Sequence, residues 1–352
     1  MSTATTTDLK TRWQALLAEE PKLRIRDAAA RLNASEAELL ATDLGNGVTR
    51  LNDDFEAQLK RVPELGKTMA LTRNHSVVIE KNGVYNMPEF FSHGGPSIGQ
   101  VVGPEIDLRL FMHAWASAFA VEKEMRGKMQ RSLQFFDHQG ESIHKIYLRD
   151  NDKVGVFEDI VSSFKADAQV APEVKPAEAP AAENGQEVDA EALLEEWRNM
   201  TNTHQFFHML RKHKVDLVQA LKIAEGEFAW RVPNDAHRTA LQQAVENEVS
   251  IMVFAGNPGC LEIHTGPIKK LMEHGDWYNI MDSGFNLHID EKGIHEIWVT
   301  EKPTEDGLVS AVEVYDKDGT QIVQFFGERK PGRKELEGWR AIIADIKSSA
   351  LN

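Results

Sequence analysis

The hydrophobic and polar residues of this chain follow two patterns, one typical of strands and one typical of helices. Each pattern occurs in both halves of the chain. Runs such as residues 76–80 (SVVIE) and 296–300 (EIWVT) are rich in β-branched residues and predict strands. Helical stretches are predicted at residues 8–43, 153–165, 189–226 and 333–349. Because helices open and close each half while strands lie between them, the pattern predicts an α+β fold with antiparallel sheets rather than a parallel sheet.

Turn residues occur at the same place in both halves. Residues 135–140 (FFDHQG) and 314–319 (VYDKDG) each place Asp and Gly between two strand-like runs. These residue types tolerate the backbone angles of a tight antiparallel turn. Each half is therefore predicted to contain a β-hairpin at this position.

The two halves are copies of one another. Residues 108–123 align with residues 287–302 at a shift of 179 positions, and the match continues without a gap through residues 132–147. At this shift Phe119 meets Trp298, and the hairpin residues of the two halves are in step.

The shift changes slightly toward the N-terminus. Residues 69–71 align with 251–253 at a shift of 182, and Trp13 aligns with Trp197 at a shift of 184. A period of this length is far above the roughly 20–50 residues of a solenoid repeat. The sequence therefore predicts a tandem duplication of one domain, in which a residue present in one copy and absent from the other is a candidate for function.

Composition marks the boundary between the copies. Residues 166–190 consist mostly of Ala, Pro, Glu, Val and small polar residues. Such a segment cannot bury enough apolar surface to offset the entropy lost on ordering. We therefore predict a first repeat at residues 1–165, a flexible linker at 166–190 and a second repeat at 191–352.

Charge and cysteine content narrow the class of protein. The 352 residues carry a formal net charge of −15, which disfavours a general nucleic-acid surface. Cys260 is the single cysteine, so neither a disulfide nor a thiolate metal cluster can form within one chain. The N-terminal residues lack the apolar core of a signal peptide, and no run of 18 apolar residues occurs, so we expect a cytoplasmic protein without membrane insertion.

One stretch imitates a DNA-binding motif. Residues 25–42 resemble a helix-turn-helix with a turn at residues 33–35. A recognition helix presents Arg, Lys, Asn or Gln to base edges, whereas the second helix here offers Glu36 and Glu38. A structural pair of helices is therefore favoured, and a DNA-binding regulator is a distant alternative.

A second stretch, residues 204–208 (HQFFH), imitates a zinc-protease motif. Two histidines four residues apart lie on one face of a helix, but Gln205 replaces the glutamate that would act as general base. His204 is the more interesting of the two, because its counterpart in the first repeat lies near Glu20. The shared fold therefore does not require this histidine.

Beyond these features, the chain resembles the bacterial haemin-transport and haemin-degrading proteins, the HemS/ChuS-like family, over essentially its whole length. The segments that carry the resemblance are residues 200–201 (MT) with 203–207 (THQFF), 105–109 (EIDLR), 302–304 (KPT) with 306–307 (DG), and 324–327 (QFFG) with 329–330 (RK).

The resemblance implies one haem (iron protoporphyrin IX) per chain, held by residues of both repeats. His204 is implied as the axial ligand of the haem iron, and Arg109 as the catalytic or distal residue on the opposite face of the haem. Further contacts to the haem are implied for Lys302, Arg329, Phe326 and Gln324, with the two cations toward the propionates or the distal pocket. Phe326 stands where some members of the family carry a tyrosine.

The duplication adds independent weight to part of this set. Arg109 aligns with His288 and is particular to the first repeat, whereas Lys302 aligns with Lys123 and has a twin. Neutral imidazole is a common haem-iron ligand, and an arginine keeps its charge at any physiological pH. Both observations suit a haem site.

The resemblance implies a role in bacterial haem uptake. The chain would accept haem from an inner-membrane haem transporter on its cytoplasmic side and degrade it oxidatively to release iron. No flavin or nicotinamide motif occurs, so electrons would come from an external donor. The alternative is a non-catalytic haem chaperone that passes haem to a downstream acceptor, and the sequence does not separate the two.

Overall fold

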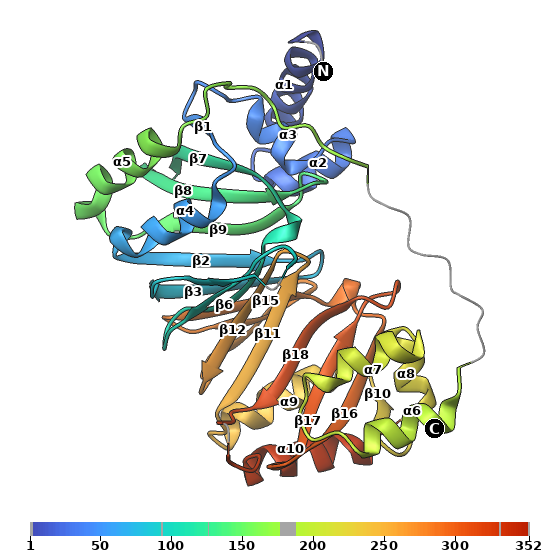
Figure 1. Ribbon diagram of the computed structural model, residues 1–352. Coiled ribbons are helices and arrows are strands. Elements are labelled where there is room, and N and C mark those ends of the chain that lie inside the picture. Colours follow the sequence, from blue (N-terminus) through green and yellow to red (C-terminus); the bar gives the residue numbers. More distant parts are fainter. Residues whose placement is uncertain (1–2, 93, 126, 177–187, 331, 351–352) are drawn as a thin grey trace. The chain divides into compact units, whose positions relative to one another are not determined.

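The computed structural model describes residues 3–92, 94–125, 127–176, 188–330 and 332–350 (Figure 1). They form two compact units. Unit 1 comprises Met1–Arg73, Glu80–Glu178 and Asn257–Glu262, and unit 2 comprises Asn74–Ile79, Ala179–Gly256 and Ile263–Asn352. Each unit therefore contains a six-residue segment from the other half of the sequence.

In unit 1 the helices are α1 (Thr3–Glu19), α2 (Ile25–Leu32), α3 (Glu36–Ala41), α4 (Phe55–Arg61) and α5 (Val154–Phe164). The strands are β1 (Val48–Leu51), β2 (Lys67–Arg73), β3 (Val77–Val84), β4 (Glu89–Phe91), β5 (Ile98–Val102), β6 (Asp107–Phe111), β7 (Trp115–Met125), β8 (Lys128–Asp137) and β9 (Ser142–Leu148). The strands of the unit are ordered β1–β7–β8–β9–β2–β3 and β12–β6–β5–β4, where β12 spans Cys260–Gly266. The first residues of β3 belong to unit 2.

Unit 2 repeats this plan. Its helices are α6 (Ala190–Arg198), α7 (Gln205–His213), α8 (Leu217–Ile223), α9 (Ala236–Glu246) and α10 (Glu337–Ser348). Its strands are β10 (Ala229–Val232), β11 (Ile251–Asn257), β12 (Cys260–Gly266), β13 (Leu271–His274), β14 (Trp277–Met281), β15 (Phe285–Asp290), β16 (Glu296–Thr304), β17 (Gly307–Tyr315) and β18 (Gln321–Gly327). The order is β10–β16–β17–β18–β11–β12 and β3–β15–β14–β13, and the first residues of β12 belong to unit 1.

The predicted α+β class and the duplication are confirmed by these elements. Strands β7–β8 and β16–β17 form the longest antiparallel ladders, and the predicted turns connect β8 to β9 and β17 to β18. Helices α4 and α9 fall inside the regions that the sequence pattern assigned to strands. Both helices pack on a sheet through only a few apolar residues. The helical spacing of apolar positions is therefore too short to stand out in the sequence.

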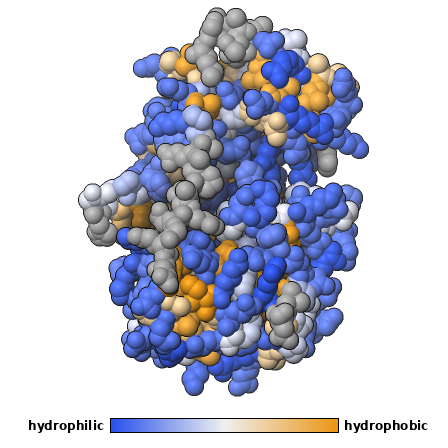
Figure 2. Space-filling view, turned by 90° about the vertical axis from the view of Figure 1, so that its right-hand side faces the viewer, coloured by the Kyte–Doolittle hydropathy of each residue, from blue (hydrophilic) through white to orange (hydrophobic). Residues whose placement is uncertain are grey.

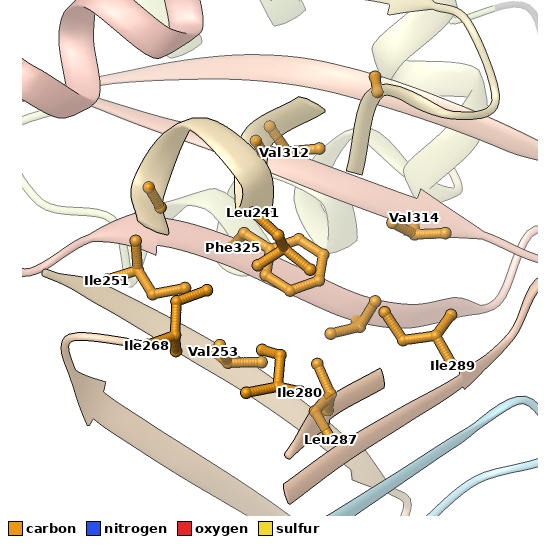
Figure 3. Packing of buried hydrophobic residues seen from close by; sticks show 14 of the residues in the cluster. Leu241, Ile251, Val253, Ile268, Ile280, Leu287, Ile289, Val312, Val314 and Phe325 are labelled. Atoms are coloured by element: carbon orange, nitrogen blue, oxygen red, sulfur yellow. The ribbon is translucent and has the colours of Figure 1, made fainter. Parts of the chain in front are cut away.

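The core of unit 2 lies between its helices and one face of its sheets. Figure 3 shows Leu241 of α9 and Phe325 of β18 directed at Val253, Ile280 and Leu287, all of which are buried. Helix α10 adds Trp339 and three isoleucines to the same cluster. The opposite face of β16–β17 is covered by α6, α7 and α8 through a second apolar cluster (Figure 1).

Two asparagines that are equivalent in the duplication fix the hairpins that pass from one unit into the other. In unit 1, Asn257 Oδ1 accepts from the backbone N–H of Gly259 and Cys260, both at 3.0 Å, and Nδ2 donates to the carbonyls of Arg73 (2.8 Å) and Ile143 (2.9 Å). Asn257 thus gives hydrogen-bond partners to four backbone groups that the turn would otherwise leave unpaired.

In unit 2, Asn74 forms the same four bonds. Its Oδ1 accepts from the N–H of Ser76 (3.0 Å) and Val77 (2.8 Å), and its Nδ2 donates to the carbonyls of Gly256 (3.0 Å) and Ile322 (2.8 Å). The two asparagines are 183 positions apart.

The same shift corrects the predicted alignment of β2 with β11. In the ladders, Thr72 pairs with His144, and Phe254 pairs with Gln324. At the shift of 179, Gln324 aligns with the residue after His144, so Phe254 corresponds to the residue before Thr72. Thr72 itself therefore corresponds to Ala255. The shift is therefore 183 here, not 182. If the alignment is wrong by one residue, the buried face of one strand is matched with the exposed face of the other. The shift of 183 instead matches the alternate buried positions of β2 with those of β11.

The first part of the predicted linker is attached to unit 1. Gln169 bonds through both side-chain atoms to the backbone of Arg50, each at 2.9 Å, and the N–H of Lys175 donates to the carbonyl of His138 at 2.7 Å. The first ten residues of this segment therefore make contacts with unit 1, and the flexible linker stays a prediction. Residues 177–187 lie outside the described residues, and α6 begins at the end of the predicted linker.

The helix-turn-helix resemblance is explained by packing. The Ser35 hydroxyl accepts from the N–H of Glu38, whose carboxylate accepts in return from the N–H of Ser35, and this capping box starts α3. Five of the six residues of α3 are buried, including Glu36, which pairs with Lys145. A helix buried in this way has no face to place in a DNA groove, so the structure supports the structural pair.

Most of the visible surface is hydrophilic (Figure 2), as the mean hydropathy of −0.41 requires. Among the described residues, no helix combines the length and apolar character needed to cross a membrane.

Candidate functional site

His204 is the residue immediately before α7, in an exposed turn of unit 2. The Asn202 Oδ1 atom accepts the backbone N–H of His204 at 2.9 Å, which identifies it as the amide oxygen. The same oxygen lies 2.7 Å from His204 Nδ1. Because an amide oxygen can only accept, this contact favours the tautomer in which the neutral ring carries its proton on Nδ1 and offers the lone pair of Nε2 to a metal.

The turn itself is held by the neighbouring glutamine. Gln205 Oε1 accepts from the backbone N–H of Thr201 (2.8 Å) and Asn202 (3.1 Å). Gln205, which cannot act as a general base, therefore fixes the loop that presents His204. A fixed ring orientation and a defined tautomer are what a metal-ligating histidine needs.

The two phenylalanines after Gln205 have opposite surroundings. Phe206 is buried and meets the Trp197 ring edge to face, with centroids 4.7 Å apart. Phe207 is 53% exposed. The helix therefore anchors itself through Phe206 and offers an apolar ring beside His204 through Phe207.

Three other predicted residues lie on one face of a single sheet in unit 2. Lys302 on β16, Gln324 and Phe326 on β18 all alternate with residues of the α9–α10 core, so they point to the face that α6–α8 cover. Phe326 meets Phe254 edge to face at 5.1 Å. The structure thus brings these residues to the same face as the helix that follows His204.

Lys302 is not a free surface cation. Its Nζ lies 2.6 Å from Glu313 Oε1 and 4.5 Å from the centroid of the Phe206 ring, and it is buried. Burial alone would raise the pKa of Glu313, but the charge and hydrogen bond of Lys302, with further bonds from Tyr315 and Thr300, hold that pKa below its ordinary value. Lys302 therefore favours the carboxylate form of Glu313.

Arg329 has the greater freedom of the two predicted cations. It follows β18, and its nearest carboxylate oxygen is that of Asp306, at 3.9 Å. The Asp306 carboxylate accepts a hydrogen bond from the backbone of Gly332 at 3.0 Å. Arg329 can therefore exchange a weak ion pair for an anionic ligand.

Arg109 belongs to unit 1, on β6. It pairs with Asp107 on the same strand and donates to the carbonyl of Leu108 at 3.0 Å. In the ladders it stands opposite Gln100 on β5 and Leu261 on β12.

The face of the β4–β5–β6 sheet that carries Arg109 combines exposed apolar side chains with the polar residues Glu89, Gln100 and Asp107. Phe91, Ile98 and Val102 share this face by alternation, and they are 46%, 51% and 53% exposed. The register places Phe91 opposite Ile98, beside the row of Gln100 and Arg109. Exposed apolar side chains next to an ion-paired guanidinium suit a flat apolar ligand with a polar edge.

Sequence reasoning missed two residues that the geometry singles out. Asn202 sets the tautomer of His204, and Glu313 is the partner of Lys302. The Asn-x-His spacing is a signal for the first, because an Asx turn brings these groups together. No comparable signal marks Glu313, which is eleven positions from Lys302.

Among the described residues, no group of three or more His, Cys, Asp and Glu side chains could hold a metal ion.

Comparison with known proteins assigns the family. The family profile described as "Haemin-degrading HemS.ChuX domain" matches twice, at residues 33–164 and 214–346. The chain is 37% identical over 330 residues to the hemin transport protein HmuS of Yersinia pestis, covering 94% of each sequence.

Two solved structures are similar over almost the whole chain. Holo-PhuS, a heme-binding protein from Pseudomonas aeruginosa, superposes with a TM-score of 0.93 at 42% identity, covering 98% of this chain and 99% of PhuS. ChuS, an E. coli heme oxygenase, gives a TM-score of 0.85 at 35% identity and covers 96% and 99%. The chain therefore belongs to the haemin-degrading HemS/ChuX family.

Proposed function

We propose that this protein binds haem and that Nε2 of His204 is the axial ligand of the iron. The observation that carries the proposal is the contact of His204 Nδ1 with Asn202, which directs Nε2 of the neutral ring to act as the ligand atom in an exposed turn. Support comes from the relatives, since PhuS is described as heme-binding and ChuS as a heme oxygenase.

Arg109 is proposed as a second contact to haem. It is the cation on the exposed apolar sheet face of unit 1, and a guanidinium can donate hydrogen bonds to a ligand or a carboxylate without losing its charge. Arg329, Gln324 and Phe326 are proposed to contact the haem from unit 2. Of these, Arg329 is the partner for a propionate, because its present ion pair is weak.

The biological role proposed is the use of imported haem in the cytoplasm. The chain would receive haem from an inner-membrane transporter and open the ring to release iron, with electrons from an external donor. Bound haem would supply an iron centre able to react with dioxygen or peroxide. The second candidate, a haem chaperone that passes haem to an acceptor, is supported by the description of PhuS as a heme-binding protein.

The ligand assignment is tested by two matched variants of the full chain. His204→Ala should weaken haem binding strongly or change the Soret band and the spin state. His208→Ala, one turn along the same exposed helix face, should leave both unchanged. If His208 is the sensitive position, the assignment of His204 is wrong.

The choice between enzyme and chaperone needs a turnover assay. Haem-loaded protein is mixed with a reductant under air, with catalase present, and released iron and open tetrapyrrole are measured. Sustained turnover that slows in Arg109→Ala, with most of the haem affinity kept, supports the enzyme. Turnover abolished by catalase, together with rapid transfer of haem to an apo-acceptor, supports the chaperone.

A further inference from the structure

The segment that leads from the last strand of a unit to its last helix differs between the two repeats. In unit 2 it comprises residues 328–336, between β18 and α10, whereas in unit 1 it comprises residues 149–153, between β9 and α5. The strands beside it are equivalent, because β8 and β9 align with β17 and β18 at a shift of 179. The difference in length therefore changes what lies beside one end of the same pair of strands.

In unit 2 the longer segment covers the outer edge of β17, which pairs with β18 only from Ala311 onward. Beside the part of β17 before this residue, Glu335 Oε1 accepts the backbone N–H of Ser310 at 2.8 Å, and Oε2 accepts the Ser310 hydroxyl at 2.9 Å. At the tip of the β16–β17 hairpin, the N–H of Gly332 donates to Asp306 at 3.0 Å. The chain thus satisfies this edge with a carboxylate of its own.

In unit 1 the equivalent edge has no such cover. Strand β8 pairs with β9 only from Ser132 onward, so among the described residues 128–131 have a strand partner on the β7 side alone. Arg131 is the twin of Ser310, and both stand opposite a glutamate of the preceding strand at the same register. The N–H of Arg131 therefore points away from β7, and alternation gives the N–H of Met129 the same direction.

A pocket of about 890 Å³ lies along this edge of unit 1. This volume is within the roughly 300–1,000 Å³ that is typical of ligand sites. The lining includes three cations and three apolar side chains, and it includes no carboxylate. These six residues are Lys128, Arg131, Arg149, Met125, Met129 and Leu148.

The charge of the pocket favours an acidic ligand. Nη2 of Arg149 lies 2.8 Å from the sulfur of Met69, and among the described residues neither Arg149 nor Lys128 forms an ion pair. Arg131 pairs with Glu122 at 2.9 Å. In a chain with a net charge of −15, a local group of cations of this kind attracts carboxylates.

The apolar part of the pocket is accessible as well. Met125 and Met129 are 49% and 50% exposed at the end of the β7–β8 hairpin. Methionine side chains are flexible and polarisable, so they adapt to apolar side chains of different shape. The pocket therefore combines an edge for main-chain pairing, cations for carboxylates and an adaptable apolar surface.

We propose that this edge of unit 1 binds an extended acidic segment of a partner protein. The segment adds as a strand beside residues 128–131 and pairs with the outward N–H of Met129, as in other complexes formed by strand addition. Its carboxylates lie next to Lys128 and Arg149, in the place that Glu335 fills in unit 2. None of these pocket residues belongs to the proposed haem site, so the surface is a second binding function of the chain.

The test uses the full-length protein and a fluorescein-labelled hexapeptide of alternating glutamate and valine. Fluorescence anisotropy measures the dissociation constant, and hydrogen–deuterium exchange with mass spectrometry follows the backbone amides of residues 128–131. Two further peptides are the probe controls. One alternates lysine and valine, and the other is the acidic peptide N-methylated at alternate residues, which cannot donate main-chain hydrogen bonds at those positions.

Lys128→Gln and Arg149→Gln should each raise the dissociation constant of the acidic peptide about three- to five-fold, as expected for exposed ion pairs. Met129→Pro removes an outward N–H and spares the bonds to β7, so it should raise the constant roughly ten-fold. Lys123→Gln, an exposed cation on β7 outside the pocket, is the control and should match the parent protein. Circular dichroism checks that each variant is folded.

Slower exchange at residues 128–131 in the presence of the acidic peptide, together with this order of variants, supports the proposal. Three results would overturn it. The acidic peptide binds no better than the lysine peptide, or Lys123→Gln weakens binding as much as Lys128→Gln, so that the pocket is not the site. Equal binding of the N-methylated peptide with unchanged exchange would make the pocket a site for small anions rather than for a strand.

Discussion

Glu262 should make unit 1 less stable as the pH rises. Its side chain is fully buried on β12, and neither carboxyl oxygen has a hydrogen-bond partner among the described residues. Burial raises its pKa to about 8, although Thr72 and the charge of Lys81 oppose the shift. At the corresponding position unit 2 has Ile79, so the fold does not need a carboxyl group here.

The sign of the effect follows from linkage. In the unfolded chain the carboxyl titrates near 4.5, whereas the folded protein keeps its proton up to about pH 8. The stabilisation is therefore complete below pH 4.5 and is lost as the pH rises through 8, at about 1.4 kcal/mol per pH unit. At pH 7.5 the loss amounts to about 4 kcal/mol.

Glu262→Gln removes this dependence because the amide does not titrate. The variant should match the parent near pH 4.5 and be more stable by about 4 kcal/mol at pH 7.5. Urea unfolding followed by circular dichroism from pH 5 to 9 measures the difference. Glu158→Gln, on α5 of the same unit and exposed, is the control. Parallel curves for the parent and Glu262→Gln across this range would refute the reasoning.

Two further outcomes are expected. Arg329→Met should raise the dissociation constant of haem roughly ten-fold, since a charge-assisted hydrogen bond is worth about 1.5–3 kcal/mol, and should leave that of haem dimethyl ester, which lacks propionate charges, unaffected; equal losses would place Arg329 away from the propionates. Asn257→Ala should lower the free energy of unfolding by about 2–4 kcal/mol, because four backbone groups lose their partner, whereas Asn247→Ala, which removes one exposed bond to Gln243, should have little effect. Urea titration of both asparagine variants checks this, and equal losses would contradict it.

Local sequence carried much of the candidate site. The stretch around His204 was recognisable because residues 203–207 (THQFF) are consecutive, whereas the contact of Asn202 with His204 became visible only in the structure. Lys302 was singled out by the sequence but its partner Glu313 was not, since Glu313 lies on the next strand and becomes a neighbour only when β16 and β17 pair. A hydrophobic pattern does not record which polar residues meet inside a sheet.

The pattern and repeats of the sequence determined that the protein is a duplicated α+β fold, because periodicity and turn residues are local properties. The tertiary structure decided that Asn74–Ile79 belongs to unit 2 and Asn257–Glu262 to unit 1. It also decided that β2 and β11 align at a shift of 183, since a strand slipped by one residue has the same composition but opposite faces. Only the paired backbones, through Asn74 and Asn257, distinguish these alternatives.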